Sequence, residues 1–185
     1  MVLTESKYIL KNGERAPSFE LRGIDGRLHK LEDYVGSNAL LIVFMCNHCP
    51  YVRAKIRKIV ELHKKYLAQG LAVVGINPNS NNPNYPDDSF ENMKKFASEY
   101  GIMFDYLADD DQEVAKKYGA VCTPDPFLFD KNLRLVYHGR VDGDHGKEKG
   151  EGKSELDIAI EELIRSGKVD IPQKPSMGCS IKWKG

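Results

Sequence analysis

Two cysteines separated by two residues, in Cys46-Asn47-His48-Cys49, are the side chains of this chain best suited to chemistry. A thiol pair at this spacing can cycle between a dithiol and a disulfide by thiol–disulfide exchange. Pro50 follows at once, and proline suits the first turn of a helix because the N–H that it lacks would have no partner there. We therefore expect a helix to begin beside the two cysteines.

The start of a helix favours negative charge on a nearby sulfur, because unpaired amide N–H groups and the positive end of the helix dipole lie there. Such sites lower a thiol pKa from about 8.5 into roughly the 3.5 to 7.5 range. His48 adds a positive charge when protonated or a hydrogen bond when neutral. We expect one thiol to be largely ionised at neutral pH, with weaker help from the basic residues Arg53, Lys55, Arg57 and Lys58.

The elements around the dithiol predict a βαβ unit. Residues 38–46 form a continuous apolar run rich in β-branched side chains, as expected of a parallel strand covered on both faces. Residues 50–69 have helical periodicity and stop at Gly70, and residues 71–77 form a second apolar strand. A strand, a helix and a strand in this order make a right-handed unit with parallel strands.

The rest of the chain completes an α/β pattern. We expect a surface loop at 78–88 on the same sheet edge as the dithiol, and a mobile Gly-rich segment at 143–152. The remaining expected elements are a hairpin at 19–31, helices at 89–100, 112–118 and 154–167, a strand at 104–107, and a hairpin of strands 126–130 and 133–141.

The second chemical motif is Val121-Cys122-Thr123-Pro124, which lies directly before the apolar strand expected at 126–130. A dithiol after the first core strand and a Thr-Pro about 75 residues later resemble the thioredoxin superfamily. The resemblance implies a thioredoxin-like α/β fold: a central, mostly parallel sheet with a C-terminal β-hairpin, flanking helices and an N-terminal hairpin extension. It also implies that Pro124 is cis and faces the dithiol, and that the backbone of Thr123 pairs with a bound substrate strand.

Residues 1–185 are expected to form a single thioredoxin-like domain, with a core of about 15–165 and a tail at 170–185. Within the superfamily the chain resembles the redoxin branch, which includes TlpA/ResA-like reductases and the AhpC/TSA-related peroxiredoxins. Thioredoxins usually have a Trp just before the first cysteine and a buried carboxylate six residues before it. Here those positions are Met45 and Leu40, so His48 becomes the candidate for handling protons.

We expect a thiol:disulfide oxidoreductase. Cys46, the more exposed sulfur by analogy, forms a mixed disulfide that Cys49 resolves, and His48 stabilises the thiolate. Thr123 and Pro124 hold the substrate, which is a protein or small-molecule disulfide, and another thiol acts as electron donor. No organic cofactor or metal is needed for this chemistry.

A thiol-dependent peroxidase is the alternative, because Cys49-Pro50 resembles the peroxidatic step of peroxiredoxins. Cys49 would be oxidised to a sulfenic acid, which Cys46 or Cys179 would resolve. Peroxiredoxins, however, have Thr or Ser where Cys46 stands, and a catalytic arginine about where Pro124 stands. The peroxide-activating groups are therefore missing from their usual positions.

Three other interpretations stay open. Cys46, His48, Cys49 and Cys122 could bind zinc, although a second close pair of ligands is missing. The dithiol could be inert, but burial would leave Asn47 and His48 without partners. Outside the dithiol, Cys122 and Cys179 are expected to be small buried hydrophobes, with a third redox thiol as the alternative. His63 is expected to be a core or boundary residue. No cluster of functional side chains is expected around His29, His138 and His145.

Composition limits the other partners. Lys plus Arg and Asp plus Glu both number 27, so no global charge favours nucleic acid or a lipid surface. The apolar run at 39–46 is far shorter than the roughly 20 residues of a membrane span. The first residues lack a secretory signal pattern, so we expect a cytoplasmic protein whose four cysteines are mostly reduced.

Overall fold

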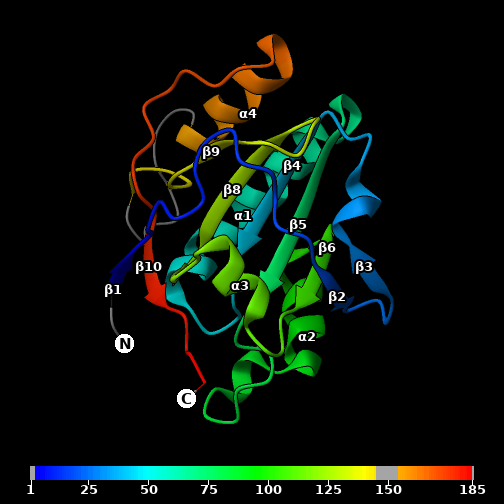
Figure 1. Ribbon diagram of the computed structural model, residues 1–185. Helices are drawn as coiled ribbons and strands as arrows, with labels where there is room; N and C mark the ends of the chain where they lie inside the picture. Colours follow the sequence, from blue (N-terminus) through cyan, green and yellow to red (C-terminus); the bar gives the residue numbers. More distant parts are fainter. Residues whose placement is uncertain (1–2, 145–153, 185) are drawn as a thin grey trace.

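The computed structural model describes residues 3–144 and 154–184 (Figure 1). Its main sheet has the strand order β3-β2-β6-β5-β4-β8-β9. The three central strands β4, β5 and β6 are parallel, and the outer pairs are antiparallel. The strands are β2 (Glu20–Gly23), β3 (Leu28–Lys30), β4 (Ala39–Phe44), β5 (Leu71–Asn77), β6 (Asp105–Ala108), β8 (Asp125–Asp130) and β9 (Leu135–His138).

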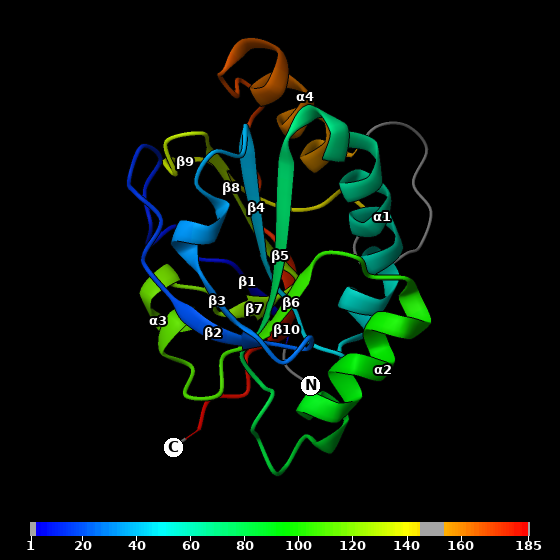
Figure 2. The same cartoon turned by 90° about the vertical axis from the view of Figure 1, so that its right-hand side faces the viewer.

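Helices cover both faces of this sheet, as Figure 2 shows. Alternate residues of β4 face opposite ways: Leu41 and Val43 pack with α1, α2 and α4, whereas Ile42 and Phe44 pack with α3. All six residues of β4 are buried, which explains its continuous apolar sequence. The helices are α1 (Pro50–Tyr66), α2 (Phe90–Tyr100), α3 (Glu113–Tyr118) and α4 (Glu155–Ser166).

The thioredoxin-like fold is confirmed, and so are the βαβ unit and both predicted hairpins. The sheet is mixed rather than mostly parallel, because only the pairs β4–β5 and β5–β6 are parallel in the part of the chain that the structure describes. The second hairpin strand is shorter than expected, ending at His138. There the chain leaves the sheet, because the Arg140 N–H donates to the Lys174 carbonyl instead of to the neighbouring strand. Apart from its first two residues, the Gly-rich segment at 143–152 lies outside the described residues.

The loop at 78–88 follows the carboxyl end of β5, on the same side of the sheet as the dithiol, as predicted. The expectation of a surface loop is wrong for much of it. Asn79, Ser80, Asn82 and Asp88 are buried, and their side chains bond backbone and side-chain groups of the loop and its neighbours. A short 3₁₀ helix, Pro86–Asp88, brings the last of them to the dithiol.

A second, three-stranded sheet was not expected from the sequence. It has the order β1-β10-β7, made by Leu3–Glu5, Met177–Ser180 and Cys122–Thr123, and all its pairs are antiparallel. The C-terminal tail thus pairs with the segment before Pro124 (Figure 1). Ile181 packs into the core, as expected of the tail, whereas Trp183 is 42% exposed.

Asp109 gives the fold a dependence on pH. Its buried carboxylate accepts hydrogen bonds from the amides of Val114 and Ala115 at the start of α3, but burial dominates and raises its pKa from 3.8 to about 6. The folded state therefore holds this proton more tightly than the unfolded chain. Stability should fall as pH rises from about 4 to 6, by about 3 kcal/mol at most.

Urea unfolding at several pH values between 4 and 7 checks this expectation. The side chain of the Asp109→Asn variant cannot ionise. The free energy of unfolding of this variant should therefore depend less steeply on pH between about 4 and 6 than that of the wild type. An unchanged slope in the variant would contradict the assignment of this proton to Asp109. The exposed Asp170→Asn variant is the matched control, because Asp170 does not contribute to the pKa of Asp109.

Candidate active site

The dithiol lies between the end of β4 and the start of α1, as predicted, and Cys49 is the residue that precedes the first turn of the helix. Cys46 and Cys49 each have an exposed fraction of 0%, so the expectation that Cys46 is the more exposed sulfur is wrong. The two thiols are hydrogen-bonded to each other. Because the loop at 78–88 and the C-terminal tail pack over this sheet end, both sulfurs are covered.

Thr123 contacts both sulfurs, and the Thr123-Pro124 peptide bond is cis, as the resemblance implied. The hydroxyl of Thr123 lies 3.3 Å from the Cys46 sulfur. The Cys49 thiol lies 3.2 Å from the Thr123 carbonyl oxygen. The two motifs of the sequence, 74 to 77 residues apart, therefore form one site.

Cys179 is the third sulfur of the site. Its Sγ lies 2.8 Å from the Sγ of Cys49, and 130 residues separate the two in the chain. Cys179 is buried, as expected, but it is more than a small hydrophobe because it bonds the dithiol. Cys122 is also buried and behaves as expected, since burial raises the pKa of its thiol. Only the pairing of the tail with Thr123 brings Cys179 here, and no local sequence signal encodes that pairing.

The three thiols differ in their readiness to ionise, and the pKa of Cys179 is raised by its hydrogen bond to Cys49 and by burial. Hydrogen bonds from Cys179 and Cys46 hold the pKa of Cys49 well below its usual range, and the Val52 amide acts in the same direction. Burial raises the pKa of Cys46, and the hydrogen bond to Cys49 and the charge of Asp88 add to this. The expectation of one ionised thiol is therefore supported, and that thiol is Cys49.

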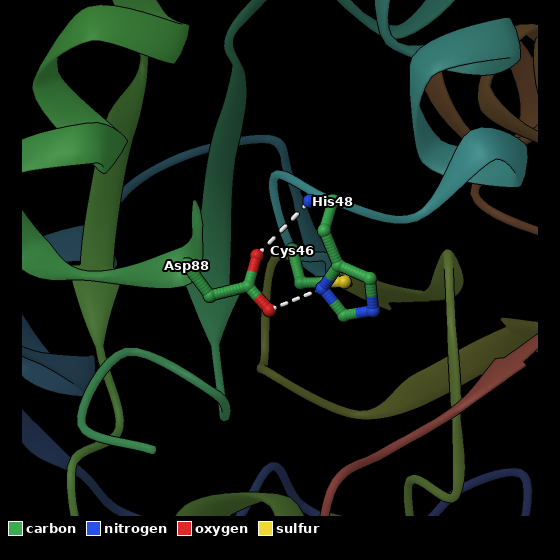
Figure 3. Close-up of side chains that lie close together, drawn as sticks. All are labelled: Cys46, His48 and Asp88. Atoms are coloured by element: carbon green, nitrogen blue, oxygen red, sulfur yellow. Dashed lines mark hydrogen bonds and ion pairs between the residues drawn. The ribbon is translucent and has the colours of Figure 1, made fainter. Parts of the chain in front are cut away.

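Asp88 is the functional residue that the sequence analysis missed. Its side chain is fully buried, and its Oδ1 accepts hydrogen bonds from the backbone N–H groups of Asn47 (2.7 Å) and His48 (3.0 Å). Its Oδ2 lies 2.5 Å from Nδ1 of the His48 ring (Figure 3). A buried carboxylate is thus present although position 40 is leucine, and it comes from the loop after β5. The Asp-rich end of that loop was the only signal in the sequence.

The contact with Asp88 fixes the state of the His48 ring. A carboxylate only accepts hydrogen bonds, so the ring proton lies on Nδ1 and the Nε2 lone pair is free when the ring is neutral. Nε2 is buried and has no hydrogen-bond partner among the described residues. Figure 3 shows the Cys46 sulfur beside the ring, and donor atoms of Cys46, His48 and Asp88 all lie within 4.8 Å of one another. The trio has the composition of a thiol, a base and an orienting acid.

Asn47 also has partners in the buried site. Tyr106 donates its hydroxyl to Asn47 Oδ1 (2.9 Å), and the Asn47 amide donates to the carbonyl of Asp87 (2.9 Å). The argument that burial would leave Asn47 and His48 unpartnered is therefore wrong for Asn47 and for Nδ1 of His48, because residues distant in the sequence supply the bonds, whereas Nε2 of His48 has no partner in the described part of the chain.

Most of the basic residues of α1 do not act on the thiols. Lys55 and Lys58 both pair with Asp142, at 2.7 Å and 2.6 Å, so their charges are neutralised locally. Arg53 donates from Nε to the Asn47 carbonyl and supports the backbone of the motif. The thiolate of Cys49 is instead stabilised by hydrogen bonds from Cys179 and Cys46 and by the amide of Val52 at the start of α1.

Two histidines for which no cluster of functional side chains was expected do have carboxylate partners. Within the described residues, His138 lies 2.9 Å from the buried carboxylate of Asp125, directly after Pro124, and His29 contacts Asp25 and Asp105. His63 is buried, in line with the expectation of a core or boundary residue. His145 lies outside the described residues.

The donor set that could hold a metal differs from the one considered in the sequence. Cys46, His48 and Asp88 offer three donor atoms, and Cys122 is not among them. Both Asp88 oxygens already accept hydrogen bonds from the motif. The geometry therefore suits a hydrogen-bonded triad better than a metal centre.

The chain resembles proteins of known sequence and structure. It is 31% identical over 123 residues to the thiol-disulfide oxidoreductase ResA of Geobacillus thermodenitrificans, a match that spans 66% of each chain. A solved structure of an uncharacterized conserved protein from Geobacillus kaustophilus has 42% identity and a TM-score of 0.91, covering 100% of this chain and 97% of that one. A hypothetical protein from Sinorhizobium meliloti has 39% identity and a TM-score of 0.92, covering 98% of this chain and 99% of that one.

A sequence model of the AhpC/TSA family matches residues 12–138, which include β4, the dithiol, Asp88 and Pro124. The match thus covers well over half of the chain. On this match, the chain belongs to the AhpC/TSA family.

Proposed function

We propose that the protein is a thiol:disulfide oxidoreductase that works through the Cys46–Cys49 dithiol. The observation that carries this proposal is the contact of the two thiols at the start of α1, beside cis-Pro124. The similarity to a ResA oxidoreductase supports it. The reaction partners are a disulfide and a thiol, and we propose a protein or small-molecule disulfide as substrate and another thiol as electron donor.

The reaction has two exchange steps. The Cys46 sulfur, as a thiolate, attacks a sulfur of the substrate disulfide; a mixed disulfide forms and one substrate thiolate leaves. The Cys49 thiolate then attacks the Cys46 sulfur; the Cys46–Cys49 disulfide forms and the second substrate thiolate leaves. The substrate gains two electrons and the dithiol loses two. The lowered pKa of Cys49 suits it to the second step.

His48 handles the proton of the first step in this proposal. Burial keeps Cys46 protonated at rest, so a base must take its proton before it attacks. Nε2 of His48 has no hydrogen bond to the Cys46 sulfur at rest, which leaves it free to serve as that base when the substrate binds, and Asp88 keeps Nδ1 protonated and the ring in place. The resulting imidazolium is stabilised by the Asp88 carboxylate and can protonate the leaving thiolate.

A thiol peroxidase is the second candidate. The lowered pKa of Cys49 favours it, because a peroxidatic sulfur must be a thiolate. Against it, Cys46 stands where peroxiredoxins have a Thr or Ser, and Pro124 stands about where they have a catalytic arginine. An antioxidant role would follow only from this second activity.

Two assays on one preparation separate the candidates. With dithiothreitol as donor, we expect the protein to accelerate insulin disulfide reduction at least about tenfold over the donor alone. Hydrogen peroxide consumption should be slower per active site. Faster turnover of peroxide than of insulin would overturn the proposal. The Cys122→Ala variant is the control, because it removes a buried thiol that bonds neither Cys46 nor Cys49 in the site described above.

None of the helices in residues 3–144 and 154–184 combines the length and the apolar character needed to cross a lipid bilayer. The cytoplasmic location expected from the sequence stays a prediction.

A further inference from the structure

Strand β10 lies where the sequence analysis expected a substrate strand. It pairs antiparallel with β7, and Cys179 is directly opposite Thr123 in that pairing. On either side of Cys179, the Ser176 hydroxyl donates to the Pro124 carbonyl (2.6 Å) and the Ile181 N–H donates to the Val121 carbonyl (2.9 Å). The chain therefore adds its own strand to the edge beside the dithiol, as peptide ligands do in β-augmentation.

Gly178 makes this close pairing achievable. A Cβ atom at this position would lie 1.9 Å from the carbonyl oxygen of Thr123 and 2.6 Å from its carbonyl carbon. Both are backbone atoms that cannot turn aside, so only glycine allows the strand to approach this far. The residue beside Cys179 thus fixes the distance between the tail and the active site.

The approach brings a third sulfur to the dithiol. Cys179 Sγ and Cys49 Sγ are 2.8 Å apart, so a movement of about 0.8 Å would complete a disulfide bond of about 2.05 Å. Cys49 contacts both other sulfurs, since it is also hydrogen-bonded to Cys46. It can therefore form a disulfide with either neighbour.

We propose that Cys179 is a third redox thiol, presented to Cys49 by a strand that occupies the substrate-docking edge, and that it takes over the disulfide formed by Cys46 and Cys49. The proposal rests on the proposed function, whose disulfide substrate supplies the oxidising equivalent. Cys179 loses its proton and attacks the Cys49 sulfur. The Cys49–Cys179 bond forms, the Cys46–Cys49 bond breaks, and Cys46 leaves with the electron pair and takes up a proton. No net oxidation accompanies this exchange, and Cys46 is free again.

Disulfide mapping tests the exchange. The protein is oxidised with glutathione disulfide, quenched with acid, alkylated and digested with trypsin. Cys46 and Cys49 fall in peptide 31–53, and Cys179 falls in peptide 169–182, because the Lys174-Pro175 bond resists cleavage. We expect the two peptides to be linked, with the alkyl group on Cys46. The link should form much more slowly in Cys46→Ser, which cannot make the Cys46–Cys49 disulfide that Cys179 takes over, and it should vanish in Cys179→Ser, which should show only the Cys46–Cys49 disulfide.

The Gly178→Ala variant tests the role of the strand. Its methyl group should push β10 away from Thr123 and lower the yield of linked peptide at least about tenfold, while the Cys46–Cys49 disulfide still forms. The Cys122→Ala variant should give the wild-type yield, because its Sγ is not the partner of Cys49. The wild-type and Cys46→Ser maps decide the proposal by themselves if the glycine variant does not fold.

The outcomes also separate this proposal from the proposed function. Peptide 31–53 carrying the Cys46–Cys49 disulfide, with Cys179 alkylated throughout, would overturn the role of Cys179 and leave insulin reduction intact. A linked peptide without insulin reduction would leave Cys179 as a redox thiol and overturn the proposed function.

Discussion

The Cys49→Ser variant is expected to accumulate a mixed disulfide on Cys46 and to lose insulin-reducing turnover by at least about 10³-fold. Cys49 is the sulfur on which the site stabilises negative charge, and that charge is what attacks the mixed disulfide. Without it the intermediate persists. Mixing the reduced variant with an aromatic disulfide such as dithionitrobenzoate should leave one thionitrobenzoate group on peptide 31–53, visible by mass spectrometry.

Cys46→Ser is the matched variant. It removes the sulfur that we propose attacks the substrate disulfide, so turnover should fall equally. When it is made in a Cys179→Ser background, where the third thiol cannot resolve a disulfide on Cys49, no mixed disulfide should accumulate at position 49. The reverse pattern, a label on Cys49 in Cys46→Ser and none on Cys46 in Cys49→Ser, would show that the two roles are exchanged. Because Cys179 lies 2.8 Å from Cys49, the trapping is repeated in the Cys49→Ser/Cys179→Ser pair, which prevents slow resolution by the third thiol.

Asp88→Asn is expected to lower turnover about 100-fold while leaving the dithiol in place. An amide at this position presents N–H groups to His48 Nδ1, so the ring proton moves to Nε2 and the free base is lost. The amide oxygen can still accept the two backbone hydrogen bonds that Asp88 Oδ1 receives from the motif. The variant should therefore fold, which circular dichroism and a melting curve check.

The pH dependence separates positioning of His48 from a merely structural role. Because the Asp88 charge contributes to the raised pKa of Cys46, its removal should lower that pKa. Cys46 alkylation should then reach half its maximal rate at lower pH, although turnover is slower. Equal losses in alkylation and turnover at every pH would contradict this role. Asp87→Asn is the control, since it removes the same charge from an exposed neighbouring side chain.

Several features of the site were predictable because their causes are local. The apolar run before Cys46 is a strand buried on both faces, and Pro50 sets the start of α1 next to the dithiol. The Thr123-Pro124 motif could be placed by resemblance, and the structure brings it to both sulfurs. In each case neighbouring residues in the chain carry the signal.

The remaining contacts depend on pairing over long distances. Asp88 lies 40 residues from His48, in a loop whose polar composition predicted a solvated surface. A loop exposed to solvent and a loop whose polar groups form hydrogen bonds inside the protein can have the same polar composition. The hydrogen-bond partners decide between the two, and they come from other elements.

The sequence by itself thus determined the dithiol, the strand and helix that carry it, and the α/β fold, since periodicity, proline and glycine act on neighbouring residues. Only the tertiary structure decided which thiol carries the negative charge, which acid orients His48, and that Cys179 joins the site. The physical reason is that pKa values and sulfur contacts depend on burial and on partners up to 130 residues away.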